Sequence, residues 1–281
     1  MRLITKLSDM TNLQGRTVLI TGASRGIGLA IAGALAAHGC NITIASKSDR
    51  PNPKLPGTIH STAALVEALG GKALPVRCDI REEVQVQNAV DRTLEHFGGL
   101  DILINNASAI WLKHVADTPM KRFDLMHEVN SRGTFLCAKI ALPHLLKSDH
   151  AHILTLAPPP NLDPKWWGSH CAYTLAKMGM SFVTLGLAAE MASNNIGISA
   201  IWPKTIIATD ALNMLPGVDV ERCRKPAIMA DAAVVLLKRK PAEVNGRFFI
   251  DEDLLRESGV HDFSQYAINQ TKPLLPDLFL N

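Results

Sequence analysis

Short apolar runs alternate along the chain with longer stretches in which apolar residues recur at helical spacing. Short runs bounded by turn residues are typical of buried strands, and longer periodic stretches are typical of helices. The runs that predict strands are residues 17–20, 41–46, 73–79, 101–104, 151–157, 196–202 and 246–251. The stretches that predict helices are residues 27–37, 62–69, 84–97, 121–146, 170–191 and 227–237. This alternation predicts a single doubly wound α/β domain, with a parallel sheet of about seven strands and helices on both faces.

The predicted domain covers residues 1–281, with a leader at 1–13 and a C-terminal extension at 252–281. The hydrophobic share of 47% is enough for a sizeable core. A net charge of +3, scattered along the chain, does not indicate a nucleic-acid partner.

Membrane and secretory features are not expected. Lys6 and Asp9 interrupt any apolar run at the N-terminus, so the pattern of a signal peptide is missing. Residues 26–46 carry no formal charge, but His38-Gly39-Cys40-Asn41 divides them into a helix and a strand, which argues against a membrane span. The five cysteines form no paired or metal-like spacing, and reduced thiols in a cytoplasmic protein fit them best.

The turn between the first strand and the first helix holds Gly22, Gly26 and Gly28. Glycine tolerates positive φ and lets a ligand approach the main chain, while a helix N-terminus offers free N–H groups and a partial positive charge. Strand, glycine turn and helix together predict a seat for the phosphates of a dinucleotide. The alternative is three glycines that only make a sharp turn.

Four motifs resemble the short-chain dehydrogenase/reductase family over about residues 14–251. They are Thr-Gly-x-x-x-Gly-x-Gly with Ser24-Arg25 inside it, Asn105-Asn106-Ala107-Ser108, Asn130 within Glu-Val-Asn-Ser-Arg-Gly-Thr, and Tyr173-Thr-Leu-Ala-Lys177. The resemblance implies a Rossmann-type fold and hydride transfer between a nicotinamide cofactor and a carbonyl/alcohol pair. It also implies a homodimer or homotetramer formed through the long helices after the fourth and fifth strands.

The expected cofactor contacts are Gly22, Ser24, Arg25, Gly26, Ile27, Gly28, Ser46, Lys47, Asp79, Ile80, Asn106, Ala107, Tyr173, Lys177, Ile206 and Thr209. At the end of the second strand a carboxylate would bind the ribose hydroxyls of NAD and repel a 2′-phosphate. This chain instead has Ser46-Lys47, with Arg25 nearby, and these groups suit a phosphate. NADP(H) is therefore favoured, NAD(H) remains possible, and the alternative is that both cations are solvated surface charges.

Other residues near the adenine end have two interpretations. The proline-rich loop at 48–58 could lie over the adenine. Asp79 resembles the family's adenine-contacting acid, or it caps the helix that begins near Arg81. Lys204 replaces the glycine that the family usually has after Pro203, which leaves Ile206 and Thr209 as candidates for the nicotinamide end.

Tyr173 and Lys177 stand at i and i+4 and share one face of a helix. A free tyrosine titrates near pH ~10, and acid–base work at neutral pH needs a pKa about three units lower, or roughly 4 kcal/mol. One cation at about 4 Å in an effective dielectric near 20 offers about that much. We therefore expect Tyr173 to be the general acid or base, with Lys177 lowering its pKa. The resemblance adds that Lys177 holds the nicotinamide ribose and that Asn130 holds a water linking this lysine to solvent.

The family's usual serine at the end of the fifth strand is missing, because Ala157-Pro158-Pro159-Pro160 occupies that region and proline has no side-chain donor. Losing one donor to a developing oxyanion can cost roughly 10²–10³ in rate. One hypothesis is that Ser169 or His170 replaces it. A second is that the chain is an NADP(H)-binding protein, a sensor or scaffold, with weak or no turnover.

Aromatic residues and a predicted lid bear on the substrate. Trp111 and Trp166-Trp167 should lie near the strand ends and indicate an apolar or lipid-like substrate, unless they are loop anchors or part of a subunit contact. Residues 210–226, with Met214, Leu215 and Pro216, resemble the family's substrate lid.

A cluster of three histidines, His144, His150 and His152, suggests a metal site. A metal-dependent hydrolase is therefore a third candidate function. No acidic or thiol ligand accompanies them and their turn is expected to be exposed, so no metal is predicted.

A narrower resemblance is to the hydroxysteroid-dehydrogenase-like branch of the family, which is linked to lipid metabolism. It rests on residues 46–58, 105–110, 157–162, 170–177 and 273–280. The missing serine is typical of that branch. Some members carry an additional sterol-carrier domain, which this chain is expected to lack.

Overall fold

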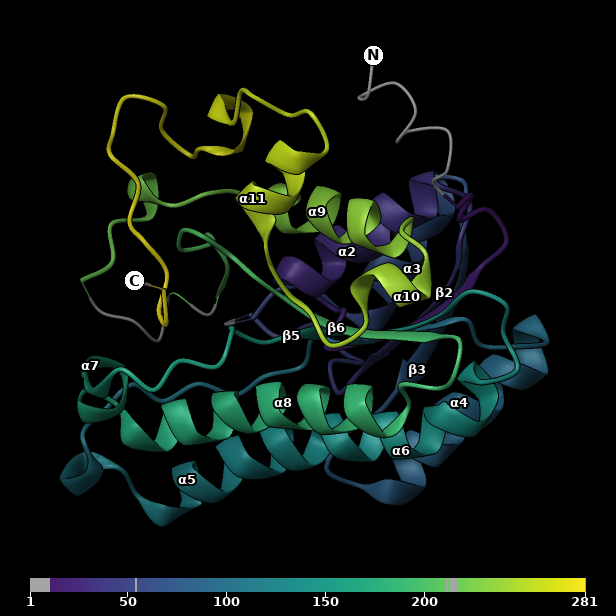
Figure 1. Ribbon diagram of the computed structural model, residues 1–281, viewed down its shortest axis with the longest axis horizontal. Helices are drawn as coiled ribbons and strands as arrows, with labels where there is room; N and C mark the ends of the chain where they lie inside the picture. Colours follow the sequence, from purple (N-terminus) through teal and green to yellow (C-terminus); the bar gives the residue numbers. More distant parts are fainter. Residues whose placement is uncertain (1–10, 54, 211, 213–216, 281) are drawn as a thin grey trace.

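Figure 1 shows the computed structural model, which describes residues 11–53, 55–210, 212 and 217–280. Its seven strands form one parallel sheet in the order β3-β2-β1-β4-β5-β6-β7. The strands are β1 Thr17–Thr21, β2 Asn41–Ser46, β3 Lys72–Arg77, β4 Ile102–Asn105, β5 Ala151–Leu156, β6 Ile196–Trp202 and β7 Phe248–Ile250. The predicted fold class is confirmed. The strand order reverses between β1 and β4, which is where a doubly wound fold opens its binding crevice.

Helices cover both faces of the sheet (Figure 1). One layer contains α2 Gly26–Ala37, α3 Ile59–Ala68, α9 Ala227–Leu237, α10 Pro241–Val244 and α11 Asp251–Glu257. The other contains α4 Glu83–Phe97, α5 Met120–Met126, α6 Gly133–Leu145 and α8 Cys171–Glu190, with the short α7 Pro164–Gly168 beside it. Single 3₁₀ turns lie at Val115–Asp117, Val220–Arg222 and Ser264–Tyr266.

The core lies in two layers because successive strand residues point to opposite faces of the sheet. Ile20 and Ile104 pack with Leu35 on one face, while Leu19 and Leu103 pack on the other face. All residues of β1, β5 and β6 are buried. These continuous apolar runs are what a parallel sheet covered on both sides requires.

Helices α10 and α11 were not predicted, and three other segments differ from the sequence prediction. The helix expected at 62 begins at Ile59, because Thr58 and Ser61 form a capping box that starts it earlier. The helix expected over 121–146 is α5 and α6 joined by a π-helical segment, His127–Arg132. The loop expected at 158–169 contains α7, whose N-terminus is capped by Asp163 through a 3.0 Å hydrogen bond from the Lys165 N–H.

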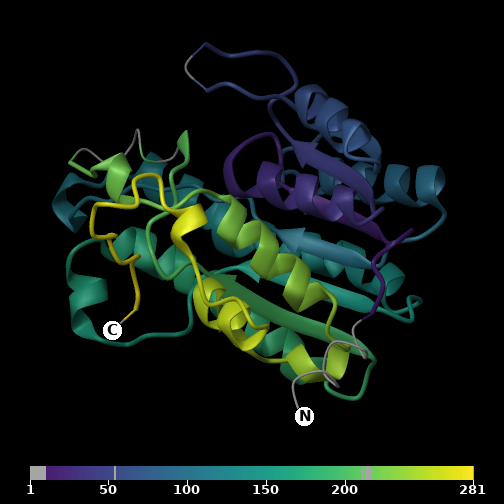
Figure 2. The same cartoon turned by 90° about the horizontal axis from the view of Figure 1, so that it is seen from above.

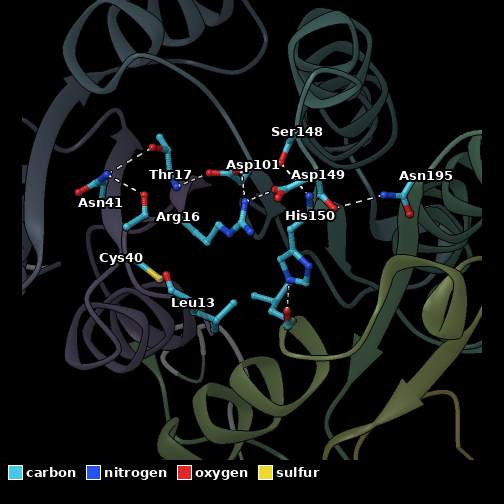
Figure 3. A network of polar contacts seen from close by, with 12 residues as sticks. Leu13, Arg16, Thr17, Cys40, Asn41, Asp101, Ser148, Asp149, His150 and Asn195 are labelled. Atoms are coloured by element: carbon cyan, nitrogen blue, oxygen red, sulfur yellow. Dashed lines mark hydrogen bonds and ion pairs between the residues drawn. The ribbon is translucent and has the colours of Figure 1, made fainter. Parts of the chain in front are cut away.

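The starts of three strands are joined by a polar network (Figure 3). Asp101 Oδ2 accepts a hydrogen bond from the Thr17 N–H at 2.8 Å, and Asp101 Oδ1 lies 3.2 Å from Arg16 Nη1. Ser148 Oγ donates to Asp101 Oδ1 at 2.5 Å, and Arg16 also pairs with Asp149. The network secures the amino-terminal edge of the sheet, so the carboxyl edge is left for a site.

Residues 11–13, the described end of the expected leader, pack against the domain. Leu13 is fully buried in the core, and the Thr11 N–H donates to the Lys238 carbonyl at 2.9 Å. Positions 1–10 lie outside the described residues.

Among the described helices, α8 has the length and composition that could cross a membrane, and 61% of its apolar window is buried inside the protein. A mostly buried core helix of a globular protein has the same length and composition, so these features of α8 are weak support for a membrane span.

The C-terminal extension returns to the carboxyl edge of the sheet. We call residues 273–280 the C-terminal strap; it lies next to α7 at one end of the molecule (Figure 2). The Leu275 N–H donates to Arg222 O at 2.9 Å, and the Asp277 N–H donates to Lys204 O at 3.1 Å. Trp202 Nε1 donates to Leu278 O at 2.9 Å. The strap is therefore part of the wall around this edge.

Candidate active site and cofactor trough

Two adjoining cavities open at the carboxyl edge of the sheet. The first, of about 450 Å³, is lined by most of the expected cofactor contacts: Gly22, Ser24, Arg25, Gly26, Ile27, Ser46, Lys47, Asp79, Ile80, Asn106, Ala107 and Thr209. The second, of about 570 Å³, is lined by Tyr173, Lys177 and Ile206 together with a mainly apolar wall. Both cavities are lined by Ile27, Asn106, Ser108, Ile110 and Thr209, so they form one continuous trough. A further groove of about 760 Å³ between α2, α3 and α9 contains neither Tyr173 nor Lys177.

The glycine turn is shaped by two requirements. Gly22 has φ +67° and Gly26 has φ +58°, in the left-handed region that favours glycine. A Cβ on Gly28 would lie 2.4 Å from Asn106 Nδ2 and 2.9 Å from the Ala23 Cα. Gly28 is not among the described residues that line the trough. Gly28 therefore allows α2 to pack closely against the end of β4, and its expected contact with the cofactor stays a prediction.

Asn106 joins the ends of β1 and β4. Its Nδ2 donates to the carbonyls of Thr21 at 2.8 Å and Gly22 at 3.1 Å. In return, Thr21 Oγ1 accepts hydrogen bonds from the backbone N–H groups of Asn106 and Ala107, at 3.0 and 3.1 Å. These bonds fix the ends of β1 and β4 relative to each other at the point where the strand order reverses. The sequence predicts this role for an amide at a strand end.

Cationic and hydroxyl groups gather at the adenosine end. Ser46 Oγ donates to Ser24 Oγ at 3.1 Å. The Arg25 guanidinium is held by Ser48 Oγ at 2.8 Å and by the Pro56 carbonyl at 3.1 Å, so the proline-rich loop lies against it. The Lys47 side chain is 58% exposed, and its Nζ lies 3.5 Å from Asp79 Oδ2. Part of the positive charge of Lys47 is therefore already balanced.

Asp79 does not cap the helix that follows it. Helix α4 has Glu82 at its N-cap with no side-chain cap bond, so that alternative was wrong. Asp79 instead binds the Arg81 side chain, with Arg81 Nη2 2.7 Å from Oδ2. Burial opposes ionisation, but the hydrogen bonds from Arg81 and the charge of Lys47 hold the pKa of Asp79 below its usual value. Asp79 is thus a carboxylate facing the trough.

Tyr173 and Lys177 lie on the face of α8 that forms the trough wall, with 5% and 3% of their surfaces exposed. Lys177 Nζ donates to Ser108 Oγ at 3.3 Å and lies 5.2 Å from the centre of the Trp202 ring. Burial lowers the pKa of Lys177 to about 7, although the charge of Asp277 opposes this. A lysine held in this way is readily switched between its two protonation states.

The expected depression of the Tyr173 pKa is not what the structure shows. Burial raises the pKa of Tyr173, and the nearby Asp277 carboxyl raises it further. The pKa expected from the sequence rests only on the cation at i+4, Lys177. Burial of Tyr173 under the strap and the nearby Asp277 carboxyl depend on the tertiary structure and could not be included.

Asn130 is fully buried in the π-helical segment. Its Oδ1 accepts from the Ala109 N–H at 2.8 Å, and its Nδ2 donates to the Ala109 carbonyl at 3.0 Å. A polar amide is tolerated here because both of its groups are paired. These bonds fix the loop that carries Ser108, the partner of Lys177.

Neither replacement proposed for the missing serine lines the described part of the trough. Pro158 is buried, and its carbonyl accepts from Ser181 Oγ at 2.7 Å. Ser169 is exposed, with its Oγ 3.5 Å from the Lys165 carbonyl, and His170 is buried with Nδ1 3.0 Å from Thr174 Oγ1. The polar groups that do face the larger cavity include Ser108, Thr209 and Asp277.

Asp277 and Phe279 are the site residues that sequence reasoning missed. Phe279 is 1% exposed and stacks on Tyr173, with ring centres 6.1 Å apart and an angle of 28° between the planes. Asp277 is the one acidic side chain among the described residues that line the larger cavity. The only local signal was a single charge in an otherwise apolar C-terminal run, which does not say where the run docks.

The tryptophans divide into two groups. Trp111 lines the larger cavity, as expected for an apolar substrate site. Trp166 and Trp167 do not line its described part, and they anchor the loop instead. The Trp166 ring lies 5.8 Å from Phe279, and Trp167 Nε1 donates to the Asn161 carbonyl at 3.1 Å.

Lys204, which stands where the family usually has glycine, ties the segment after β6 to the start of α11. Its N–H donates to Asp251 Oδ1 at 2.8 Å, and its Nζ binds Glu252 at 3.1 Å and Asp253 at 3.0 Å. The segment after it runs along the trough, where Ile206 and Thr209 both form part of the lining.

The predicted lid at 210–226 is only partly described. Leu212 and Val218 line the larger cavity. Met214, Leu215 and Pro216 lie outside the described residues.

The histidines at the start of β5 are buried, not exposed as expected. His150 and His152 pack edge to face with ring centres 4.5 Å apart, and His150 Nε2 lies 2.7 Å from the Leu237 carbonyl. Within the described ranges, no three His, Cys, Asp or Glu residues come together in a way that could hold a metal.

Comparisons with known proteins agree with this geometry. The family model described as short chain dehydrogenase matches residues 16–216. Hydroxysteroid dehydrogenase-like protein 2 of Danio rerio is 52% identical over 276 residues, which are 98% of this chain and 66% of that protein. The human protein of the same name is also 52% identical, with the same coverage. The chain thus spans about two thirds of the length of these relatives.

Two solved structures have the same fold. A protein of Xanthomonas campestris is 61% identical, with a TM-score of 0.95, over 96% of this chain and 100% of its own. A short chain dehydrogenase of Mycobacterium thermoresistibile is 45% identical, with a TM-score of 0.91 and 96% of both chains covered.

Proposed function

The chain belongs to the short-chain dehydrogenase/reductase family, and we propose that it is an NADP(H)-dependent oxidoreductase acting on the carbonyl/alcohol pair of an apolar or lipid-like substrate. One observation carries the proposal. Tyr173 and Lys177 line a 570 Å³ cavity that adjoins the cavity of the glycine turn. A dinucleotide lying along this trough would have its phosphates at Gly22 and Gly26 and its reactive end beside Tyr173.

When bound, the nicotinamide would supply or accept the hydride. In the reducing direction the Tyr173 hydroxyl gives a proton to the carbonyl oxygen, and in the oxidising direction the Tyr173 oxygen accepts one. Lys177, held by Ser108, places a cation beside this end of the trough. The walls formed by Trp111, Trp202 and other apolar residues exclude water and favour an apolar substrate.

The preference for the phosphorylated cofactor is supported by Ser46, Lys47 and Arg25 at the adenosine end. A charge-assisted hydrogen bond contributes about 1.5–3 kcal/mol, so Lys47→Ala should weaken NADPH binding roughly 10–100-fold and leave NADH binding nearly unchanged. Titration calorimetry measures both affinities. Lys72→Ala, at an exposed position on the outer strand, is the matched control. Equal loss for the two cofactors would contradict the assignment.

The catalytic proposal is tested by NADPH oxidation over a panel of ketones, aldehydes, ketosteroids and long-chain 3-oxoacyl compounds. Removing a general acid typically costs 10²–10⁴-fold in rate, and we expect Tyr173→Phe to lose about that much on any compound the protein reduces. Tyr266→Phe is the matched control, because the Tyr266 hydroxyl donates to Asp231 at 2.6 Å and does not line the cavity. A rate that survives Tyr173→Phe would refute the role.

A second function is kept because Pro158 replaces the usual donor: an NADP(H)-binding protein, a sensor or scaffold, with little turnover. It predicts tight NADPH binding and no Tyr173-dependent rate on any compound of the panel. The same two measurements therefore separate the two functions.

We further propose a homodimer or homotetramer in the cytoplasm. Phe135 on α6 and Leu175, Phe182 and Leu185 on α8 are exposed apolar side chains on the helices after β4 and β5. Phe182→Asp should lower the mass measured by light scattering, whereas Val84→Asp on α4 should not. The compartment is supported by five free cysteines, and a fluorescent fusion tests it.

A further inference from the structure

The C-terminal strap brings a carboxyl group to the substrate cavity. Thr205 pairs with Pro276 in an antiparallel bridge, and the Asp277 N–H donates to Lys204 O at 3.1 Å. On the other side, Trp202 Nε1 holds the Leu278 carbonyl at 2.9 Å. Asp277 is therefore anchored on both sides, next to the segment that follows β6, in the cavity wall that it shares with Tyr173.

Only one oxygen of this carboxyl is engaged by the described residues. Asp277 Oδ1 accepts a hydrogen bond from the Leu278 N–H at 2.6 Å. No ion pair joins Asp277 to Lys177 or to any other described cation. The cavity around it is largely apolar, with Trp202, Ile206 and Leu278 among its walls. An unpaired anion in such surroundings is costly, whereas a protonated carboxyl has an O–H to donate.

The charges that face Asp277 act in both directions. Tyr173 and Lys177 face it from α8, Asp251 from the start of α11, Cys223 from the segment before α9, and Lys113 lies in the same cavity wall. Burial raises the pKa of Asp277 to about 7, the Asp251 charge adds to this rise, and Lys177 opposes it. A substantial fraction of Asp277 is therefore protonated at neutral pH.

We propose that Asp277 donates the hydrogen bond to the substrate's carbonyl oxygen that the missing fifth-strand serine would have donated. The inference rests on the proposed oxidoreductase function and adds a catalytic residue to it. The side chain comes from the end of the chain, so Pro158 can replace the serine without leaving the oxyanion unsupported. Tyr173 gives the proton to the same oxygen, and Asp277 stabilises the charge that develops there.

Two substitutions test this role with any ketone that the protein reduces in a Tyr173-dependent way. Asp277→Asn keeps an N–H donor without a titrating proton, and Asp277→Ala removes the donor. At pH 6 we expect kcat of the asparagine variant to stay within about threefold of the unmodified protein, and kcat of the alanine variant to fall at least tenfold.

The pH profile separates donation from a structural effect. As pH rises through about 7 the unmodified protein loses the Asp277 proton, so the asparagine variant should be the faster of the two at pH 8.5. Phe279→Leu, which loosens the strap but keeps the carboxyl, should not reproduce this crossover. The proposal is overturned if Asp277→Ala retains full kcat, or if the asparagine variant falls as far as the alanine variant at pH 6.

A spectroscopic test does not depend on turnover. In infrared difference spectra of the unmodified protein against Asp277→Asn, a protonated carboxyl band should be present at pH 6 and lost at pH 8.5. The absence of that band at pH 6 overturns the proposal even if no substrate is ever found. Failure of the proposed function shows itself separately, as the absence of any Tyr173-dependent rate.

Discussion

Replacing Phe279 with alanine should release the C-terminal strap from the active-site wall. The Phe279 ring is 1% exposed and lies 5.8 to 6.1 Å, centre to centre, from the rings of Trp166, Trp202, His170 and Tyr173. Truncating a buried phenylalanine costs about 3–5 kcal/mol. Phe279 has φ +70°, and alanine gains nothing there because it meets the same steric conflict.

The loss should appear as local opening and not as global unfolding. The strap is held by a few hydrogen bonds and lies outside the sheet, so it can detach while the sheet stays folded. At 1.4 kcal/mol per factor of ten, about 3–5 kcal/mol corresponds to roughly 10²–4 × 10³ in the opening constant. The amides of Leu275 and Asp277, which donate to Arg222 and Lys204, should exchange faster by that factor.

Hydrogen exchange measured by NMR or mass spectrometry gives the result directly. The Leu154 amide in β5 is the internal reference and should keep its protection in Phe279→Ala. Phe279→Gly should destabilise the docked strap by about 1–2 kcal/mol less than Phe279→Ala does, because glycine removes the steric conflict at positive φ. Unchanged exchange at Leu275 and Asp277, or an equal rise at Leu154, would refute the claim that Phe279 holds the strap.

Two further predictions concern other parts of the fold. Gly28→Ala places a Cβ 2.4 Å from Asn106 Nδ2 and should lower the free energy of unfolding by about 1–3 kcal/mol in urea titrations, whereas Gly99→Ala, with no neighbour within 4 Å, should not. His152 is buried and neutral, with its pKa lowered to about 3 by burial, so its contribution to stability is present above its unfolded pKa of about 6.5 and is lost as pH falls. Between pH 6.5 and 5.0 this loss is up to about 2 kcal/mol, and urea titrations of His152→Leu should show a smaller decrease over that range.

Local features of the sequence were enough to predict the frame of the site. Strand and helix alternation follows from apolar periodicity, which the chain expresses over windows of a few residues. The local sequence also predicts the turn of Gly22 and Gly26, which have positive φ, and the position of Asn106 at a strand end. The parallel sheet then brings these strand ends to one edge, where Tyr173 and Lys177 join them.

The rest of the site depends on contacts between segments far apart in the chain. Asn130 finds its partner in Ala109 only after β4 and the π-helical segment pack together. Asn106 lies so close to Gly28 that a Cβ there would be 2.4 Å from its Nδ2, which the spacing of the glycines does not reveal.

The environment of Tyr173 shows most clearly what the tertiary structure decides. A helix face placed Lys177 beside it, and from this pair alone a lowered pKa was expected. The strap then buries Tyr173 and adds the carboxyl of Asp277, which raises the pKa instead. A side-chain pKa depends on all charges and on the water around it, and about one hundred residues separate Tyr173 from Asp277. Periodicity therefore determined the strands, the helices and the shared face of Tyr173 and Lys177, and only the folded chain determined what surrounds that pair.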